Sequence, residues 1–463
     1  MASSDTLMVS ISGIRGIVGK TFNARTVEKY ISAFATLLKG HRDSPLVVVG
    51  RDSRISGPWI TSVAEGVLAS LGCTVFQCGI VSTPTVQLLV QQHKADGGLI
   101  ITSSHNPVEW NGLKFVDGDG LFLSPSKCAQ LFDIADKSAQ IFPSNDNLGR
   151  VLPEPEANKK HLDAILSLPF IDAEMIQRKK FKVVLDTIHG AGGPIMEELL
   201  VRLGCEVVGL NLEPTGKFHR NPEPLPEHLG ELCAKVKEVG ADLGIATDPD
   251  VDRCVLIDEK GNPLGEEYTL AIAVKLVLGV VGKRGKVCKN LSSSRVVDDI
   301  AREYGCEVIN TPVGEIHVAK MMEEVKAVIG GEGNGGVMLP DVHIGRDAPV
   351  AATLALQLLT KFEGSLSALK LSLPQYEIAK MKAPVPAKFD AGLEELKKMY
   401  HGKGTISEVD GMRIDTKEGW VHIRKSNTEP VYRVIGEFGS SLKESTEKCQ
   451  DLINKFANIC NNL

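Results

Sequence analysis

The chain has 463 residues, of which 43% are hydrophobic and 24% are charged, and its net charge at pH 7 is −6. This length exceeds what one hydrophobic core normally organises and predicts three or four domains. The negative charge argues against nucleic acid as the main partner, because binding to a phosphate backbone requires clustered excess lysine and arginine. No run approaches about 18 uninterrupted apolar residues, and residues 1–10 lack the pattern of a secretory signal. The sequence therefore predicts a soluble protein without a membrane span.

The ten cysteines are too few to form a disulfide scaffold in a chain of this length. The nearest pair, Cys73 and Cys78, has no second pair beside it that would complete a zinc site. We therefore expect reduced thiols packed among apolar residues, and a cytoplasmic location.

A repeat organises the first three quarters of the chain. A helix-period pattern ends in Gly-Cys-x-Val three times, at residues 72–75, 204–207 and 305–308. Before each helix an apolar strand is expected, at 46–50, 181–185 and 286–291. After it a second apolar strand is expected, at 98–101, 243–246 and 327–329, and a polar loop follows each of these. Such a repeat predicts three similar α/β domains that present loops where these sheets bind ligands.

The segments between and after the repeats differ in composition. Residues 142–158 are rich in Pro, Asn and Glu, as expected of a linker, residues 258–263 form a turn cluster, and periodicity weakens over 363–374. The last part has a strand, a loop and a strand over 420–437. A helix follows whose apolar face is expected to contain Leu442, Cys449, Leu452, Ile453 and Phe456.

The predicted fold class is therefore α/β, with three similar mixed α/β domains plus a smaller C-terminal α+β domain around a central cleft. The predicted domains are residues 1–155, 156–257, 258–370 and 371–463, each with one polar loop.

Several cations lie near the first of these loops in the sequence. Arg15 stands between glycines in the segment 12–16, Arg51 and Arg54 follow the first strand of the repeat, and Lys114 follows the first polar loop. Taken singly, such residues are more often surface charges than catalytic groups, and we interpret Arg51 and Arg54 as surface charges.

The first loop, Thr-Ser-Ser-His-Asn-Pro at 102–107, places hydroxyls, an imidazole and an amide directly after a buried strand. Polar groups in that position cost desolvation unless they have partners. A serine here is a candidate nucleophile, provided that a cation or a base activates it. A Ser/Asn-rich turn closed by Pro107 is the alternative. A hydrolase triad is not indicated, because triads assemble in space and the Gly-x-Ser-x-Gly elbow is absent.

The second loop, Asp-Pro-Asp-Val-Asp-Arg at 248–253, has three carboxylates at alternating positions. They would repel one another without a cation, and a hard divalent metal with oxygen ligands is their natural partner. An EF-hand is excluded, because its sixth position is Arg253 instead of glycine and its flanks are strand-like. We favour a compact Mg²⁺ site over a solvated acidic turn, with Arg253 able to hold a phosphate or carboxylate beside it.

The third loop, Gly-Glu-Gly-Asn-Gly-Gly at 331–336, matches G-x-G-x-x-G, but a strand ended by Pro340 follows instead of the helix that a dinucleotide site needs. Glu332 and Asn334 suit paired hydrogen bonds to sugar hydroxyls, and a plain glycine turn is the alternative.

The fourth loop, Arg-Lys-Ser-Asn-Thr-Glu-Pro at 424–430 with Arg433 after it, offers cations and hydroxyl donors to a phosphate monoester. A solvated hairpin tip is the alternative there.

In this order, the segments resemble the α-D-phosphohexomutase superfamily, which includes phosphoglucomutase, phosphomannomutase and phosphoglucosamine mutase. The resemblance covers essentially the whole chain and rests on five motifs, at residues 12–16, 102–107, 248–253, 331–335 and 424–430. It implies an isomerase that interconverts hexose 6-phosphate and hexose 1-phosphate through a phosphoserine enzyme. Hexose 1,6-bisphosphate would be both the intermediate and the activator.

The resemblance also implies a role for each motif. Ser104 is the implied phosphoserine, with His105 beside it, and Arg15 and Lys114 match the positions of the general acid and base. One Mg²⁺ per chain would be bound by the phosphoserine together with Asp248, Asp250 and Asp252. Glu332 and Asn334 would orient the sugar. The implied clamp for the non-transferring phosphate contains Arg424, Ser426, Asn427 and Thr428, and Arg253 and Arg433 are further candidates for substrate binding.

Two departures from the family pattern bear on these roles. Ser103 stands where many members have alanine, which leaves two candidate hydroxyls, and Gly336 stands where many bacterial members have histidine. The segments 12–16 and 331–336 look like those of the subgroup called phosphoglucosamine mutase, which implies conversion of glucosamine 6-phosphate to glucosamine 1-phosphate.

Three alternatives to that function remain open. A phosphoglucomutase/phosphomannomutase is the closest, and a serine-dependent sugar phosphatase and an inactive sugar-phosphate-binding protein are the others. The expected partner is a small sugar phosphate, without nucleic acid or membrane, and the chain is expected to be a monomer or homodimer.

Overall fold

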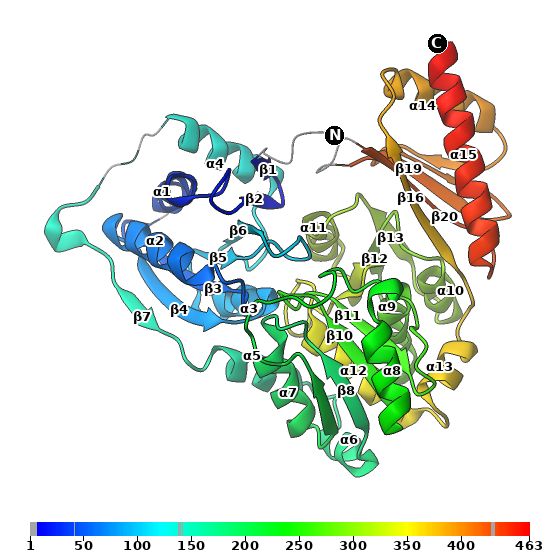
Figure 1. Ribbon diagram of the computed structural model, residues 1–463, viewed down its shortest axis with the longest axis horizontal. Helices are drawn as coiled ribbons and strands as arrows, with labels where there is room; N and C mark the ends of the chain where they lie inside the picture. The colour runs from blue at the N-terminus through cyan, green and yellow to red at the C-terminus, as the bar shows by residue number, and fades with distance from the viewer. Residues whose placement is uncertain (1–6, 41, 138–139, 141, 427–430) are drawn as a thin grey trace.

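The computed structural model describes residues 7–40, 42–137, 140, 142–426 and 431–463. Four β-sheets follow one another along the chain. In Figure 1 the first and last sheets lie on opposite sides of the molecule, and the second and third sheets lie below and between them.

The first domain contains a seven-stranded sheet in the order β1-β2-β6-β5-β3-β4-β7. Its strands are β1 Met8–Ser10, β2 Gly13–Ile17, β3 Leu46–Arg51, β4 Thr74–Ile80, β5 Gly97–Ile101, β6 Trp110–Asp117 and β7 Val151–Pro153. Its helices are α1 Ala24–Lys39, α2 Gly57–Ser70, α3 Thr83–His93 and α4 Pro125–Lys137, with a 3₁₀ turn, η1, at Asn145–Asn147. β7 pairs in parallel with β4, so the predicted linker 142–158 also extends this sheet.

The second and third domains each contain a four-stranded sheet. The second domain has β8 Lys182–Asp186, β9 Glu206–Leu210, β10 Leu243–Thr247 and β11 Cys254–Asp258, with α5 Ala157–Leu166, α6 Ala173–Lys179, α7 Gly192–Arg202, η2 Pro226–His228 and α8 Gly230–Val239. The third has β12 Val287–Asn290, β13 Val308–Thr311, β14 Ile329–Glu332 and β15 Gly336–Met338, with α9 Glu266–Lys275, η3 Leu276–Val280, α10 Val296–Glu303, α11 Glu315–Val325, α12 Ala348–Lys361 and α13 Leu366–Ser372. The helix α13 occupies the stretch where the sequence periodicity weakens.

The three sheets share one strand order, which confirms the predicted repeat. The equivalent orders are β6-β5-β3-β4, β11-β10-β8-β9 and β15-β14-β12-β13. The strands β5, β10 and β14 are each parallel to one neighbour and antiparallel to the strand that follows in the chain. The glycines that end the repeat helices have positive φ, at Gly72, Gly204 and Gly305, as their predicted position at a helix end requires.

The polar motifs therefore occupy equivalent places in the three domains. Each lies between a central strand and its antiparallel neighbour, at the carboxyl end of the central strand. We call them the serine loop (102–107), the acidic loop (248–253) and the glycine loop (331–336).

The fourth domain is an antiparallel sheet covered by two helices. Its strand order is β16-β20-β19-β18-β17. Its elements are β16 Ile378–Pro384, α14 Phe389–Tyr400, β17 Thr405–Ser407, β18 Met412–Asp415, β19 Trp420–Lys425, β20 Val431–Glu437 and α15 Leu442–Asn462. The predicted motif at 424–430, here the basic loop, joins β19 to β20, and its residues 427–430 lie outside the described part of the chain.

The predicted apolar face of α15 is correct except at its first residue. Cys449, Leu452, Ile453 and Phe456 are buried against the sheet, whereas Leu442 is 53% exposed. Side chains on a helix point back toward its N-terminus, so Leu442 projects beyond the end of the covered face. The prediction for Leu442 was therefore wrong.

The hydrophobic cores show how the domains are joined. The first and fourth domains each have a core of their own. One large cluster runs from Leu162 to Leu373 and takes in α9 and α12, so the second and third domains pack as one unit.

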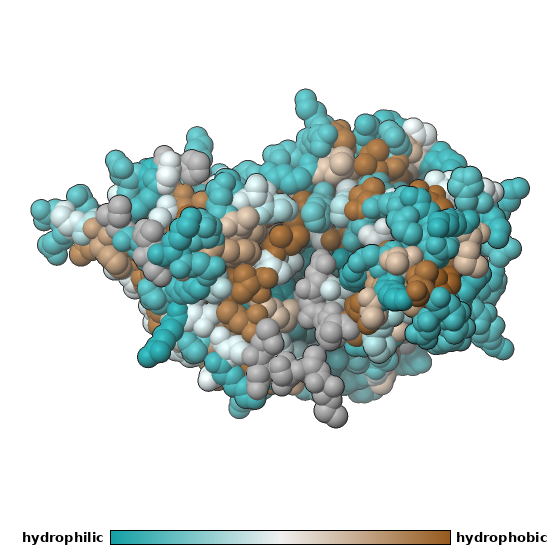
Figure 2. All heavy atoms as spheres, turned by 90° about the horizontal axis from the view of Figure 1, so that it is seen from above, coloured by the Kyte–Doolittle hydropathy of each residue, from teal (hydrophilic) through white to brown (hydrophobic). Residues whose placement is uncertain are grey.

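The face of the molecule seen from above carries both hydrophobic and hydrophilic residues. Figure 2 shows hydrophobic residues there as separate patches among hydrophilic ones. Among the described residues, no helix has the length and apolar character required to cross a membrane.

Candidate active site

The serine loop and the acidic loop meet, although they belong to different domains. Ser104 Oγ donates to Asp248 Oδ2 at 3.3 Å, and both side chains are buried. Ser104 and Val251 have φ values of 49° and 63°, in the left-handed region that residues other than glycine rarely adopt. Such strain persists only where surrounding contacts fix the backbone, and it is typical of functional loops.

Arg54 supplies many of those contacts to the serine loop. Its guanidinium donates to the carbonyl oxygens of Ser104, Asn106, Pro107 and Trp110, at distances of 2.6 to 2.9 Å. Its Nε pairs with Asp52 Oδ2 at 3.1 Å, and Arg54 is fully buried. The interpretation of Arg54 as a surface charge was therefore wrong. A single cation cannot be read from the sequence as the organiser of a loop about fifty positions away, since its partners are backbone carbonyls that carry no sequence signal.

Arg51, the other cation interpreted as a surface charge, is half-buried. Its Nη1 donates to the carbonyl oxygen of Asp52 at 3.0 Å, and burial lowers its pKa. Arg51 thus keeps part of its side chain at the surface, and its guanidinium also contacts the turn that carries Asp52 and Arg54.

Three aspartates of the acidic loop form a compact cluster. Asp248, Asp250 and Asp252 are all fully buried, and each offers a carboxylate oxygen within 4.8 Å of the others. Burial and repulsion from the other two carboxylates raise the pKa of Asp248 well above its ordinary value. Burial alone would also raise the pKa of Asp250, but the Lys114 ammonium, 2.7 Å from Asp250 Oδ2, lowers it. The cluster thus concentrates negative charge that a bound cation would neutralise.

The cluster also fits a hard metal ion by its donor atoms. Asp250 Oδ1 and Asp252 Oδ1 are buried and accept no hydrogen bond from the described residues. Unsatisfied buried carboxylate oxygens are costly, and oxygen ligands are those that Mg²⁺ prefers. The residues present therefore suit a divalent cation at this position.

The acidic loop is also held by the first domain. Thr83, the first residue of α3, donates through Oγ1 to Asp250 Oδ2 at 2.8 Å and through its backbone N–H to the Asp250 carbonyl at 2.9 Å. The sequence patterns gave no indication of Thr83, because a threonine at the start of a helix is common.

Three further predicted residues lie around the serine loop. Arg15 Nη1 donates to Asn106 Oδ1 at 3.0 Å, and burial lowers its pKa. Arg253 Nη2 donates to His105 Nδ1 at 3.1 Å. Burial, together with the nearby charges of Arg253 and Arg15, lowers the pKa of His105 well below its ordinary value. This lowered pKa favours the neutral form of the His105 imidazole.

The glycine loop presents Glu332 and Asn334 next to one another. Glu332 Oε1 accepts from Asn290 Nδ2 at 2.7 Å and from the backbone N–H of Gly314 at 3.0 Å. Asn334 Nδ2 donates to Glu332 Oε2 at 3.4 Å. Burial alone would raise the pKa of Glu332, but Arg346 lowers it, so this residue is an ionised acceptor.

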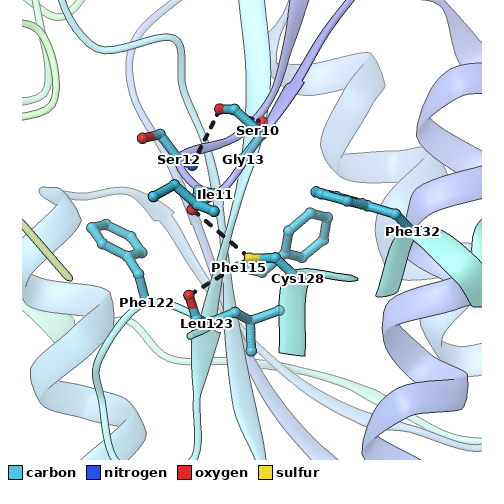
Figure 3. Close-up of a pocket in the computed structure, with 9 residues that line it drawn as sticks. All are labelled: Ser10, Ile11, Ser12, Gly13, Phe115, Phe122, Leu123, Cys128 and Phe132. Carbon is cyan, nitrogen blue, oxygen red and sulfur yellow. Dashed lines mark hydrogen bonds between the residues drawn. The ribbon is translucent and has the colours of Figure 1, made fainter. Parts of the chain in front are cut away.

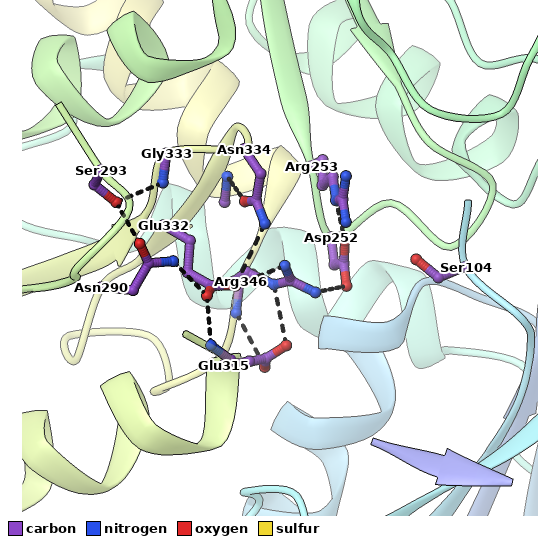
Figure 4. Close-up of polar contacts among 12 residues, drawn as sticks. Ser104, Asp252, Arg253, Asn290, Ser293, Glu315, Glu332, Gly333, Asn334 and Arg346 are labelled. Carbon is purple, nitrogen blue, oxygen red and sulfur yellow. Dashed lines mark hydrogen bonds and ion pairs between the residues drawn. The ribbon is translucent and has the colours of Figure 1, made fainter. Parts of the chain in front are cut away.

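Arg346 connects the acidic loop to the glycine loop and was not identified from the sequence. Figure 4 shows its guanidinium among three carboxylates from separate segments. It donates to Asp252 Oδ2 at 2.6 Å, to Glu332 Oε2 at 2.9 Å and to Glu315 Oε2 at 3.1 Å. Arg346 stands alone in the segment before α12, outside any motif, so only the fold brings it to the site.

Arg424, at the start of the basic loop, stands apart from this cluster. Arg424 Nε donates to Asp410 Oδ2 at 2.9 Å within the fourth domain. Among the described residues, Arg424 forms no hydrogen bond or ion pair with the serine, acidic or glycine loop. Ser426 and Arg433 flank the same turn, and the predicted residues Asn427 and Thr428 lie outside the described part of the chain.

A small cavity behind residues 10–13 is not a substrate site. It has a volume of about 10 Å³ and is lined mainly by apolar side chains, including Phe115, Phe122 and Phe132. Figure 3 shows Phe115 and Phe132 on one side of Cys128 and Phe122 on the other, and the Cys128 thiol donates to the carbonyl oxygens of Ile11 and Leu123. A space of this size holds one water molecule at most.

Comparison with known domain families gives four matches in succession. Residues 8–141, 140–261 and 265–376 match "Phosphoglucomutase/phosphomannomutase, alpha/beta/alpha" domains I, II and III. Residues 380–453 match the "Phosphoglucomutase/phosphomannomutase, C-terminal domain".

Individual proteins are similar over nearly the same length. A "Probable phosphoglucosamine mutase" of Methanopyrus kandleri is 35% identical over 451 residues, which cover 97% of this chain and 96% of the relative. A "Phosphoglucomutase/phosphomannomutase" of Thermococcus kodakarensis is 37% identical over 434 residues, covering 93% and 94%. Among solved structures, a phosphoglucomutase/phosphomannomutase family protein from Burkholderia thailandensis has a TM-score of 0.84 at 24% identity and covers 100% of this chain and 98% of its own. That structure supports the fold alone.

Proposed function

The chain belongs to the phosphoglucomutase/phosphomannomutase family, and on this premise we propose that it is a phosphohexomutase that works through phosphorylated Ser104. It interconverts a hexose 6-phosphate and the corresponding hexose 1-phosphate. The observation that carries this proposal is the 3.3 Å between Ser104 Oγ and Asp248 Oδ2, which places a candidate nucleophile against the acidic cluster.

The reaction requires two phosphoryl transfers at Ser104. In the first, the bond between phosphorus and Ser104 Oγ breaks and a new bond forms to a free hydroxyl of the hexose phosphate. That hydroxyl loses its proton, and Ser104 Oγ takes up a proton to become a hydroxyl. The product is hexose 1,6-bisphosphate. After the sugar has reoriented, its other phosphoryl group is transferred to Ser104 Oγ, which loses its proton, and the sugar oxygen that is released takes up a proton.

Arg15 and Lys114 are the residues that we assign to these proton transfers. Both are close to the serine and acidic loops, Arg15 through Asn106 and Lys114 through Asp250. The lowered pKa of the buried Arg15 favours proton exchange more than an exposed guanidinium would. His105, neutral and bound to Arg253, orients the Ser104 hydroxyl, which lies 3.2 Å from its Nδ1.

We assign Mg²⁺ binding, one ion per chain, to Asp248, Asp250 and Asp252 together with the phosphate on Ser104. The two unsatisfied buried oxygens of Asp250 and Asp252 support this assignment. When bound, the ion would offset negative charge on the phosphoryl oxygens.

Substrate binding is assigned to three loops. Glu332 and Asn334 receive sugar hydroxyls, and Arg253 lies beside the acidic cluster where a phosphoryl group would arrive. The basic loop, with Arg424, Ser426, Asn427, Thr428 and Arg433, holds the phosphate that is not transferred. Because one clamp must hold either phosphate, the fourth domain is expected to open and close over the other three.

Glucosamine phosphate is the substrate that we propose, since relatives at 32% to 35% identity bear the name phosphoglucosamine mutase. Glucose or mannose phosphate is the alternative, supported by the relative from Thermococcus kodakarensis. The domain boundaries 1–155, 156–257, 258–370 and 371–463, a monomer or homodimer, and a cytoplasmic location all stay predictions.

The direct test compares substrates. The chain is incubated with Mg²⁺, a trace of hexose 1,6-bisphosphate, and the 6-phosphates of glucosamine, N-acetylglucosamine, glucose or mannose. We expect the isomeric 1-phosphate to form with the highest kcat/KM for glucosamine. A higher kcat/KM for the glucose or mannose phosphate would identify a different substrate but would still support a phosphohexomutase. Release of inorganic phosphate without any 1-phosphate would contradict a mutase.

A further inference from the structure

Each carboxylate around Arg346 accepts from the guanidinium through one oxygen. On Asp252, Oδ2 accepts from Arg346 Nη2, while Oδ1 accepts no hydrogen bond from the described residues. A carboxylate fixed at one oxygen presents the other in a defined direction. The contact with Arg346 therefore determines how Asp252 offers its remaining oxygen to a cation.

The same guanidinium fixes Glu332 from the opposite side. Glu332 Oε2 accepts from Arg346 Nη1, while Oε1 is occupied by Asn290 and by the backbone of Gly314. Glu315, at the start of α11, accepts from Arg346 Nε and so holds the guanidinium in place. Because the guanidinium is planar and rigid, the three carboxylates cannot shift independently of one another.

The sequence of the glycine loop makes room for this arginine. A Cβ atom added to Gly336 would lie 2.3 Å from Arg346 Cδ and 2.8 Å from its Cγ. These distances are too short for any side chain, so Arg346 occupies the space that a larger residue at 336 would fill. Gly336 has no positive φ, and the requirement for glycine there comes from Arg346 and its neighbours rather than from the backbone.

We propose that Arg346 is a positioning residue that couples the acidic loop to the glycine loop, so that affinity for the divalent cation and affinity for the hexose phosphate depend on the same guanidinium. The inference rests on the proposed function for the identity of the two ligands. It adds a residue that lies outside the five motifs, and a dependence between two sites in different domains.

The charge on Arg346 must be separated from its geometry in any test. Removing the charge would leave the site more negative and attract a cation more strongly, which would mask a loss of positioning. Arg346→Lys retains the charge, but one ammonium group cannot bridge three carboxylates that lie in different directions. Gly336→Ala leaves Arg346 in the chain and displaces it, which provides an independent perturbation.

The test measures binding separately from turnover. Mg²⁺ is titrated calorimetrically into the full chain, and glucosamine 6-phosphate and glucose 6-phosphate are titrated in a second series at saturating Mg²⁺. In Arg346→Lys we expect both affinities to fall about 10-fold or more, while circular dichroism stays that of the wild type. Gly336→Ala is expected to weaken both affinities in the same direction. Gly66→Ala, where an added Cβ meets nothing within 4 Å, should change neither.

The outcomes distinguish this inference from the proposed function. If either affinity is unchanged in both Arg346→Lys and Gly336→Ala, the coupling does not exist. If Arg346→Lys does not fold, Gly336→Ala decides alone. If the wild type binds both ligands but forms no isomeric sugar phosphate, the proposed function fails, and the binding data still decide whether Arg346 couples the loops.

Discussion

Ser104 Oγ and Asp248 Oδ2 lie 3.3 Å apart, although 144 positions separate the two residues in the chain. The contact depends on the packing of the first domain against the second, because each residue sits at the carboxyl end of a strand in a different sheet. The α3 helix contributes to this packing through Thr83, which binds Asp250 by both its side chain and its backbone. The chemistry proposed at Ser104 thus requires the interface as well as the loops.

Thr83→Val should weaken cation binding by the acidic cluster without changing the charge of the cluster. The variant keeps the shape of the side chain and removes the hydroxyl that donates to Asp250 Oδ2. Loss of a supporting hydrogen bond to a metal ligand typically reduces metal affinity or activity by about 10- to 100-fold. The Mg²⁺ dependence of kcat/KM measures the effect. Thr61→Val is the control, since its hydroxyl only bonds the Gly57 carbonyl within α2, and equal activity of the two variants would contradict this role for Thr83.

Arg54→Lys should disturb the serine loop. A lysine cannot replace a guanidinium that donates to four carbonyl oxygens and pairs with Asp52, so several buried acceptors would lose their donors. We expect a loss of about 3 kcal/mol in the free energy of unfolding and a fall in kcat of about 100-fold. Urea denaturation and steady-state assays measure these changes. Wild-type kcat in Arg54→Lys would show that the loop forms without this support, and the exposed Arg25→Lys serves as the control.

Arg54 and Arg346 show where prediction from the sequence ends. The repeat was predicted from local patterns, because strands, helix ends and polar loops are encoded over short stretches. The convergence of Ser104 with Asp248 was expected only from the family resemblance, since it depends on how the domains pack. Neither arginine belongs to a motif. Their roles come from backbone carbonyls and carboxylates supplied by distant segments, and such partners become visible only once the domains are packed.

Glu267→Gln should change how stability depends on pH. Burial raises the pKa of Glu267 to about 7, against an opposing effect of Lys380. Between the ordinary glutamate pKa and about 7, Glu267 is protonated in the folded chain and ionised in the unfolded chain. The free energy of unfolding is therefore highest below this pH range and falls as the pH rises through it. The loss amounts to about 3 kcal/mol, and Glu267→Gln should remove it.

Urea denaturation at pH 5 and pH 8 tests this dependence on Glu267. The wild type should lose stability between the two values by more than Glu267→Gln does, and the exposed Glu394→Gln should follow the wild type. Identical slopes for the wild type and Glu267→Gln would show that Glu267 is ionised in the folded chain.

Asp347→Asn should loosen the junction of the first three domains. Asp347 Oδ2 accepts from His161 at 2.7 Å and from His343 at 2.9 Å, and His161 in turn bonds Thr85 of α3. All of these side chains are buried, so an amide in place of the carboxylate leaves donors unsatisfied. We expect a loss of about 3 kcal/mol in the free energy of unfolding.

Thermal and urea denaturation measure the effect of Asp347→Asn, with Asp451→Asn on the exposed face of α15 as the control. Equal stability of the two variants would mean that the histidines find other partners, and that the junction does not depend on this carboxylate.

The central claim is tested most directly by locating the phosphate on the chain. The protein is incubated with hexose 1,6-bisphosphate and Mg²⁺, and peptides are mapped by mass spectrometry for the wild type, Ser103→Ala and Ser104→Ala. We predict one phosphate on Ser104 in the wild type and in Ser103→Ala. Ser104→Ala should fold, carry no phosphate and lose nearly all turnover. Full turnover in Ser104→Ala, or a phosphate found on Ser103 alone, would contradict the account.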